Sequence, residues 1–164
     1  MYFLARNIIE VPYQMVFPLL ISLILYWFVN LSNTATQFFT YYLTAFILSL
    51  TGSSLGMLIG SFVDRQSASS IIQIVIELCI VFGGYIKNLG NIPWWIRWVT
   101  FLSPIRYGFT AGIKNEVQFA STSNIADLNL DYSIWINILL LFCLGIFYRL
   151  LTLLTLYMLR SKLQ

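Results

Sequence analysis

Two polar side chains four residues apart, Gln73 and Glu77, interrupt an apolar stretch of this sequence. On a helix, residues at this spacing lie on one face, one turn apart. An ionisable side chain inside a membrane costs several kcal/mol if it faces lipid. The sequence therefore predicts that Glu77 either lines a wet cavity or bonds to a neighbouring helix as a structural carboxyl, and both interpretations stay open at this point.

A second charge, Arg149, lies inside the last apolar stretch of the chain. Its long side chain can reach the nearer membrane surface, pair with a carboxylate or contact another helix. Cys79 and Cys143 also lie in apolar runs, and we interpret them as small buried hydrophobic residues. The chain contains no His, which is the most common metal ligand in proteins, so we predict no metal site.

Enzyme chemistry has little support in this sequence. The phosphate-binding pattern G-x-x-x-x-G-K-[ST] is absent, so we expect no ATP binding by this chain. Without His, no serine can be activated as a nucleophile in the usual way. We therefore predict that the chain has no catalytic residue, holds no cofactor of its own and is not an enzyme.

The composition indicates a protein that is surrounded by lipid. Hydrophobic residues make up 59% of the 164 residues and charged residues only 9%, whereas soluble domains carry about 25% charged residues. The net charge is +3, but the Lys and Arg residues are scattered singly. No basic stripe could neutralise a row of phosphates, which excludes nucleic acid as an expected partner.

Four stretches are long and apolar enough to cross a membrane, a task that needs about 20 residues for about 30 Å of hydrocarbon. They are residues 8–31, 38–62, 70–86 and 134–159. All four are much longer than the strands of about 10 residues in membrane barrels. The sequence therefore predicts an all-α polytopic membrane protein. Four crossings place both termini on one side, and the denser Lys and Arg residues there favour the cytoplasm.

Small residues recur along the second stretch at helical spacing. They are Ser49, Gly52, Ser53, Gly56 and Gly60. Because small residues let two helix backbones approach closely in lipid, we expect this stripe to pack against a neighbouring helix.

The connector after the third stretch, residues 87–133, is long, and its first half is still apolar and aromatic. Trp residues are interspersed with Arg residues in it: Trp94, Trp95, Arg97, Trp98 and Arg106. Trp is enriched where lipid meets water. We therefore predict a re-entrant segment at about residues 92–118, which lies at or dips into one membrane surface.

The stretch from Phe82 to Glu116 closely resembles the signature of the G (White-like) subfamily of ABC exporters. In that family a pattern P-x-W-x-x-W is followed by S-P-x-R-Y-G-F and then by N-E. The matching residues are Pro93, Trp95, Trp98, Ser103, Pro104, Arg106, Tyr107, Gly108, Phe109, Asn115 and Glu116. Residues 2–14 resemble the start of the third membrane helix of the family, so the resemblance covers nearly the whole chain.

The resemblance implies that residues 1–164 are the C-terminal part of an exporter transmembrane domain, with four transmembrane helices plus a re-entrant extracellular helical hairpin. In the family, the fifth helix lines a central substrate cavity, which by position assigns Gln73, Glu77 and Ile80 to the cavity wall. The same helix ends in an apolar plug below the extracellular exit, here Tyr85 and Ile86. The termini would be cytoplasmic, in the plasma membrane or an internal membrane.

The resemblance also implies partners that would precede this chain, namely an ATP-binding domain with its ATP and Mg, and helices one and two of the same transporter. Two such halves would form a homodimer or heterodimer within membrane lipid. The whole would export lipophilic substrates such as a lipid, sterol or xenobiotic by alternating access. Two alternatives stay open: an ATP-independent channel or carrier in which Glu77 binds a cation, and a membrane scaffold subunit.

The topology can be tested by cysteine labelling. After Cys79 and Cys143 are replaced by Ser, single cysteines at Ser67 and Ser123 should react with a membrane-impermeant thiol reagent from opposite sides, because one membrane crossing and a re-entrant segment separate them. Labelling of both from one side would contradict the four-span prediction, and exchanged sides would reverse the orientation.

Overall fold

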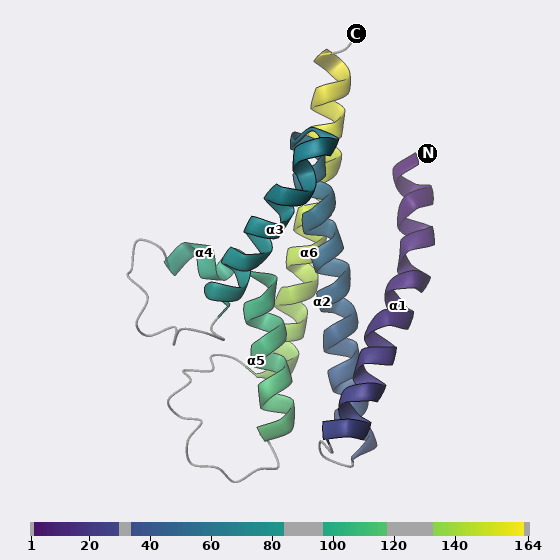
Figure 1. Cartoon of the computed structure of the whole chain (residues 1–164), viewed down its shortest axis with the longest axis vertical. Coiled ribbons are helices and arrows are strands. Elements are labelled where there is room, and N and C mark those ends of the chain that lie inside the picture. Colours follow the sequence, from purple (N-terminus) through teal and green to yellow (C-terminus); the bar gives the residue numbers. More distant parts are fainter. Residues whose placement is uncertain (1, 30–33, 84–96, 118–132, 163–164) are drawn as a thin grey trace.

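The computed structural model describes residues 2–29, 34–83, 97–117 and 133–162, and every element in these ranges is an α-helix (Figure 1). The helices are α1 (Tyr2–Val29), α2 (Ala35–Phe62), α3 (Arg65–Val81), α4 (Arg97–Leu102), α5 (Pro104–Val117) and α6 (Ile134–Lys162). The predicted all-α membrane fold is therefore confirmed.

Three helices are long and apolar enough to cross a membrane, over Ile9–Phe28, Ala35–Phe62 and Ile134–Met158. They match the first, second and fourth predicted spans. The third predicted span, 70–86, corresponds to α3, which has 17 residues and is about 26 Å long at 1.5 Å per residue. Because its predicted end lies outside the described residues, the fourth crossing stays a prediction.

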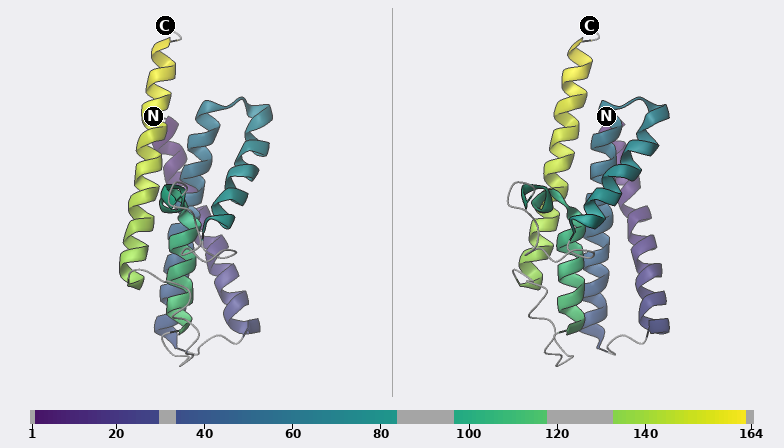
Figure 2. Two further views of the ribbon diagram at one scale, coloured as in Figure 1. Left: turned by 90° about the vertical axis from the view of Figure 1, so that its left-hand side faces the viewer. Right: turned by 60° about the vertical axis from the view of Figure 1, so that its left-hand side comes forward.

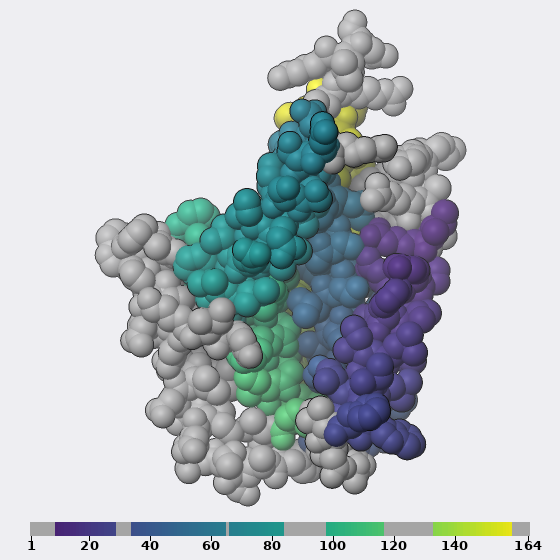
Figure 3. All heavy atoms as spheres, in the orientation of Figure 1, coloured from purple at the N-terminus to yellow at the C-terminus, as the bar shows by residue number. Residues whose placement is uncertain are grey.

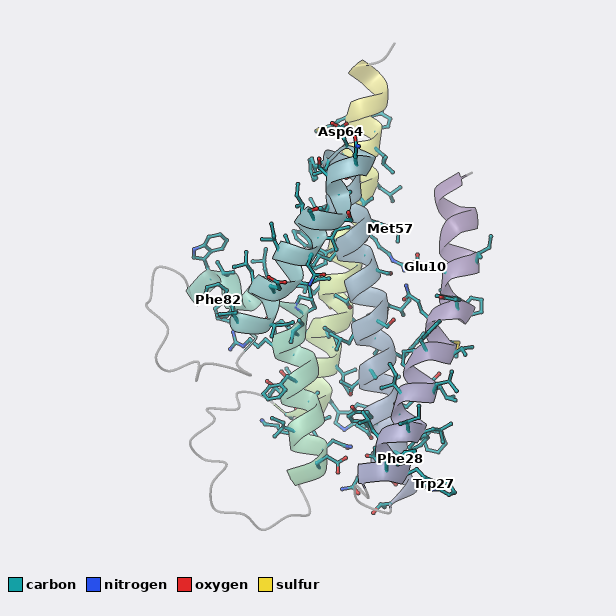
Figure 4. All side chains as sticks on the ribbon, viewed as in Figure 1. Glu10, Trp27, Phe28, Met57, Asp64 and Phe82 are labelled. Carbon is teal, nitrogen blue, oxygen red and sulfur yellow. The ribbon has the colours of Figure 1, made fainter. Side chains whose placement is uncertain are left out.

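The directions of α1, α2 and α3 alternate, α5 continues in the direction of α3, and α6 returns, so that the beginning of α1 and the end of α6 lie at the same end of the bundle (Figure 1). The reversal between α2 and α3 takes two residues, Val63 and Asp64, both with extended backbone. The Asp64 carbonyl accepts the backbone N–H of Ser67 at 3.0 Å, which closes the first turn of α3. Figure 4 shows Asp64 at the end of the bundle that also holds the termini.

Two helices in succession replace a fourth long helix. Figure 2 shows α3 in the half of the bundle near the termini and α5 in the other half, with α4 lying crosswise between them. The predicted re-entrant segment, 92–118, thus contains a short helical pair that bends at Ser103, between Leu102 and Pro104. Proline suits the first position of a helix because the N–H it lacks has no partner there.

The core lies where α2, α5 and α6 meet. Its buried residues are Ile47, Tyr107, Ala111, Ile138 and Leu141. The outer surface is apolar as well: on α1, Trp27 is 85% and Phe28 81% exposed, and both lie at the end of α1 away from the termini (Figure 4). In a soluble protein such a surface would aggregate, whereas lipid solvates it.

Polar side chains join α2 to α6 along the membrane-spanning length. The Thr51 hydroxyl donates to the Leu141 carbonyl at 3.1 Å, and the Arg149 Nε donates to the Ser54 Oγ at 3.0 Å. Ser61 and Thr155 share a further hydrogen bond of 3.1 Å. Of the three roles considered for Arg149, the structure therefore supports a helix contact.

The glycine stripe of α2 is not used as predicted. A Cβ atom added at Gly52, Gly56 or Gly60 would meet no atom within 4 Å, so no described helix packs closely there. Gly52 and Gly56 instead border an apolar pocket of about 230 Å³ between α2, α3 and α5. Figure 3 shows α2 in view between α3 and α1. The glycines have no close neighbour because α2 turns Thr51 and Ser54, rather than its glycines, toward α6.

The close approach of α6 to α2 depends on Gly145, where an added Cβ would lie 3.0 Å from the Thr51 hydroxyl and 3.6 Å from its Cα. We expect Gly145→Leu to destabilise the bundle by about 1–3 kcal/mol, as overpacking does in close-packed interiors. Unfolding by SDS in mixed micelles measures this. Gly60→Leu is the matched control and should have little effect; an equal loss in both would contradict the assigned packing.

Candidate functional site

The polar stripe predicted from the sequence exists on α3. Gln73 Nε2 donates to Glu77 Oε1 at 3.1 Å, and both side chains are exposed. Ile80, one turn further on, is half-buried. The described helices thus leave the carboxyl of Glu77 uncovered, and within them its one hydrogen-bond partner is its own neighbour Gln73.

The end of α3 is fastened to the start of α5. The hydroxyl of Ser103, which is buried, donates to the Cys79 carbonyl at 2.8 Å. This carbonyl lies in the last turn of α3, where the helix itself supplies no donor. Gly83 lies against α5 so closely that an added Cβ would be 3.0 Å from Ile105 and 2.8 Å from the Cys79 carbonyl oxygen. Only glycine fits there without displacing backbone.

A buried arginine holds the bend between α4 and α5. Arg106 is 7% exposed and donates from Nη1 to the Thr100 hydroxyl at 3.0 Å. Its guanidinium lies 4.7 Å from the centre of the Phe101 ring. Hydrogen bonding and the attraction between a cation and an aromatic face together stabilise a charge that would otherwise be unfavourable in this setting.

Two tyrosines satisfy the carbonyls at the end of α4. Tyr107 donates to the Phe101 carbonyl at 3.0 Å, and Tyr148 of α6 donates to the Leu102 carbonyl at 2.6 Å. Gly108 then lets α5 approach α2, since an added Cβ would lie 2.9 Å from a Leu48 methyl group. Together these contacts fix α3, α4, α5 and α6 around one elbow, which we define as residues 100–108.

The other end of α5 is held by a polar cluster on three helices. Asn115 Nδ2 donates to the Gln37 carbonyl at 2.9 Å, and Gln37 Nε2 donates back to the Asn115 carbonyl at 3.2 Å. The Tyr26 hydroxyl donates to Glu116 Oε1 at 2.7 Å. The cluster joins α1, α2 and α5, so the short helix is anchored at both of its ends.

The sequence of the chain has relatives among transport proteins. The family model described as ABC-2 type transporter matches residues 1–117. The chain belongs to this family. Because the relatives include ABC transporter G family members, this ABC-2 type transporter chain is a transmembrane region of the G subfamily.

Three relatives illustrate the degree of similarity. ABC transporter G family member 1 of Dictyostelium discoideum is 29% identical over 75% of this chain and 16% of its own length. The brefeldin A resistance protein of Schizosaccharomyces pombe is 32% identical over 70% of this chain and 8% of its own. ABC transporter G family member 7 of Arabidopsis thaliana is 31% identical over 70% of this chain and 16% of its own. The ABC-2 type transporter chain thus spans a small part of each.

The site residues expected in this ABC-2 type transporter chain differ in where they lie. Ser103, Pro104, Arg106, Tyr107 and Gly108 come together in the elbow and are all buried. Trp98 lies in α4 and is 63% exposed. The predicted plug residues, Tyr85 and Ile86, and the motif residues Pro93 and Trp95 lie outside the described residues.

Sequence reasoning missed the partners of these motif residues. Tyr148 and Thr100 complete the elbow, and Tyr26 and Gln37 complete the polar cluster. The signal for the cluster was present in part, because Asn115 and Glu116 belong to the recognised pattern. Their contacts join residues 78 and 90 positions apart, which no local pattern indicates.

The elbow can be tested by removing one hydroxyl. Tyr148→Phe leaves the Leu102 carbonyl without its donor, and we expect a loss of about 1–3 kcal/mol in unfolding free energy, as for other unpaired buried polar groups. Tyr157→Phe, the same change at a 78% exposed position of the same helix, should have no comparable effect. The two variants are compared by thermal unfolding in detergent, and equal midpoints would contradict the role of the elbow.

Proposed function

We propose that this chain is the membrane-spanning part of an ATP-driven exporter that moves lipophilic substrates by alternating access. Membership of the ABC-2 type transporter family supports a transporter permease. One relative is a brefeldin A resistance protein, and we extend transport of lipophilic small molecules, including lipids, sterols or xenobiotics, to this chain.

One observation carries the proposal, namely the exposed pair Gln73 and Glu77 in a helix of a membrane domain. Lipid cannot hydrogen-bond a carboxyl, so this face of α3 needs water, substrate or a second protein surface. We propose that Gln73, Glu77 and Ile80 form part of the wall of a substrate cavity at the axis of a dimer. Tyr85 and Ile86 would close its extracellular exit.

In this proposal, ATP hydrolysis is carried out by partners of this chain. An ATP-binding domain of the same transporter would hydrolyse ATP with Mg, and helices one and two together with a second transporter half would complete the cavity. This chain would supply the moving walls, with the termini in the cytoplasm. Because the elbow links the end of α3 to α5 and α6, a shift of α3 would carry the re-entrant pair with it.

A cation channel or carrier is the second candidate, with Glu77 as the ligand. Cation sites for hard ions gather six or more oxygen ligands, several of them carboxylates. Within the described residues, no group of three or more His, Cys, Asp or Glu side chains comes together. The exposed Gln73–Glu77 pair therefore fits a polar contact with a large substrate better than it fits a cation site.

Two substitutions of Glu77 in the full transporter test the cavity proposal. Glu77→Gln should keep expression and change the preference between substrates by about tenfold, the effect of one charge-assisted hydrogen bond. Glu77→Leu should also keep expression, but it should alter transport and substrate-stimulated ATPase activity. Rates are measured per folded molecule in proteoliposomes.

The structural alternative gives a different result. If Glu77 only bonds to a neighbouring helix, Glu77→Leu should lower expression and thermal stability while transport per folded molecule stays unchanged. Leu78→Ile, next to it on the exposed surface of α3, is the control for local packing. Loss of stability without any change in substrate preference would rule out the cavity role.

A further inference from the structure

The buried face of α1 is polar. Along one row at four-residue spacing stand Glu10, Gln14, Pro18, Ser22 and Tyr26. Gln14 is 8% and Ser22 0% exposed, Pro18 is buried and Glu10 is half-buried. The apolar residues of α1 lie on its outer side instead. This is the reverse of a helix in a soluble protein, and it agrees with bilayer solvation, which favours apolar side chains on the side that faces lipid.

This row faces α2. Tyr42 of α2 donates to the Met15 carbonyl at 3.4 Å, and the rings of Tyr26 and Phe38 are in contact, 5.2 Å apart. Figure 4 shows Glu10 on the side of α1 turned toward α2, and Met57 on the side of α2 turned toward α1. We call the row of Glu10, Gln14 and Ser22 on α1, together with Gln37 of α2 at the polar cluster that includes Tyr26, the α1–α2 seam.

Within the part of the chain that the structure describes, four oxygen atoms of the seam are buried and have no hydrogen-bond partner: Glu10 Oε2, Gln14 Oε1, Ser22 Oγ and Gln37 Oε1. Gln14 Nε2 donates to Glu10 Oε1 at 2.9 Å. This bond involves neither Glu10 Oε2 nor Gln14 Oε1, which therefore stay unpaired among the described residues. Pro18 adds to the deficit because it has no N–H to donate to the Gln14 carbonyl one turn earlier.

A dry seam of this kind is unfavourable. An unpaired buried polar group loses its hydration without compensation, and the loss exceeds what one ordinary hydrogen bond contributes. Buried polar groups in native proteins are almost always paired, with protein or with ordered water. Carboxylate and amide oxygens are acceptors only, so what binds here must donate hydrogen bonds, and the enclosure of these atoms limits it to a small molecule.

We propose that the α1–α2 seam binds a row of water molecules that runs from Glu10 past Gln14 and Ser22 to Gln37, and that opens to the aqueous phase at Glu10. Glu10 is half-buried and lies near the start of the apolar stretch predicted from the sequence, residues 8–31, which is where water would enter. Water contacts can be exchanged singly, so α1 can shift along α2 without breaking a fixed pair of side chains. This inference holds whatever the substrate is.

Silver ions test the row, because they are small enough to follow water and they bind thiolates, which form in water and not in lipid. The full transporter is prepared with Cys79→Ser and Cys143→Ser, reconstituted in liposomes, and given Ser22→Cys or the control Leu23→Cys. Leu23 is the next residue and is 45% exposed on the outer surface. Free thiols are counted after quenching and denaturation.

We expect Ser22→Cys to react with Ag⁺ at least about tenfold faster than Leu23→Cys. The thiolate is the reactive form, and a thiol in contact with water ionises more readily than one that faces lipid. Equal rates, or a faster reaction at Leu23→Cys, would overturn the proposal. The pair Gln14→Cys and Met15→Cys repeats the test one turn from Glu10, should Ser22→Cys not fold. Gln14→Leu adds a thermal measurement: a higher Tm would show a dry seam relieved of an unpaired group and would overturn the proposal.

Discussion

Hydrocarbon offers no hydrogen bonds, and this constraint governs the whole bundle. Polar groups away from the surface bond to a carbonyl of their own helix, as Thr44 and Thr152 do, or to another helix, and several of the bonds between helices involve α2. This helix bonds to α6 through Thr51 and Ser54 and to α5 through Gln37. The buried core lies on the same side of α2. The positions of α5 and α6 therefore follow from which residues α2 presents to them.

Hydropathy alone predicted α1, α2 and α6, because a run of about 20 apolar residues has few alternatives to a membrane helix. The third predicted span, 70–86, begins inside α3, which starts at Arg65, since a helix can extend into the charged region at the membrane surface. The packing of α5 could not be predicted. It depends on Gln37 meeting Asn115, and on Tyr148 meeting Leu102, contacts between residues far apart in sequence.

In the candidate site too, the sequence indicates local features better than contacts between distant residues. Ser103, Arg106 and Tyr107 of the recognised motif lie together in the elbow, and Gln73 and Glu77 share one face of α3. The glycines of α2 meet no described helix closely, because small residues permit close packing without requiring it. The polar row of α1 was not predicted, although its four-residue spacing is visible in the sequence. A hydropathy profile treats such isolated polar residues only as interruptions of an apolar run.

The short length of α5 bears on how the protein is made. Its 14 residues span about 21 Å, too little to enter a bilayer as an independent transmembrane segment. Its buried Arg106 and Asn115 are accommodated by α4 and α2, and its elbow is closed by Tyr148 of α6. During synthesis α6 emerges after α5, so the elbow can close only once α6 has arrived. A nascent chain that stalls between α5 and α6 would therefore expose an incomplete elbow to quality control, even though α1 to α5 are present.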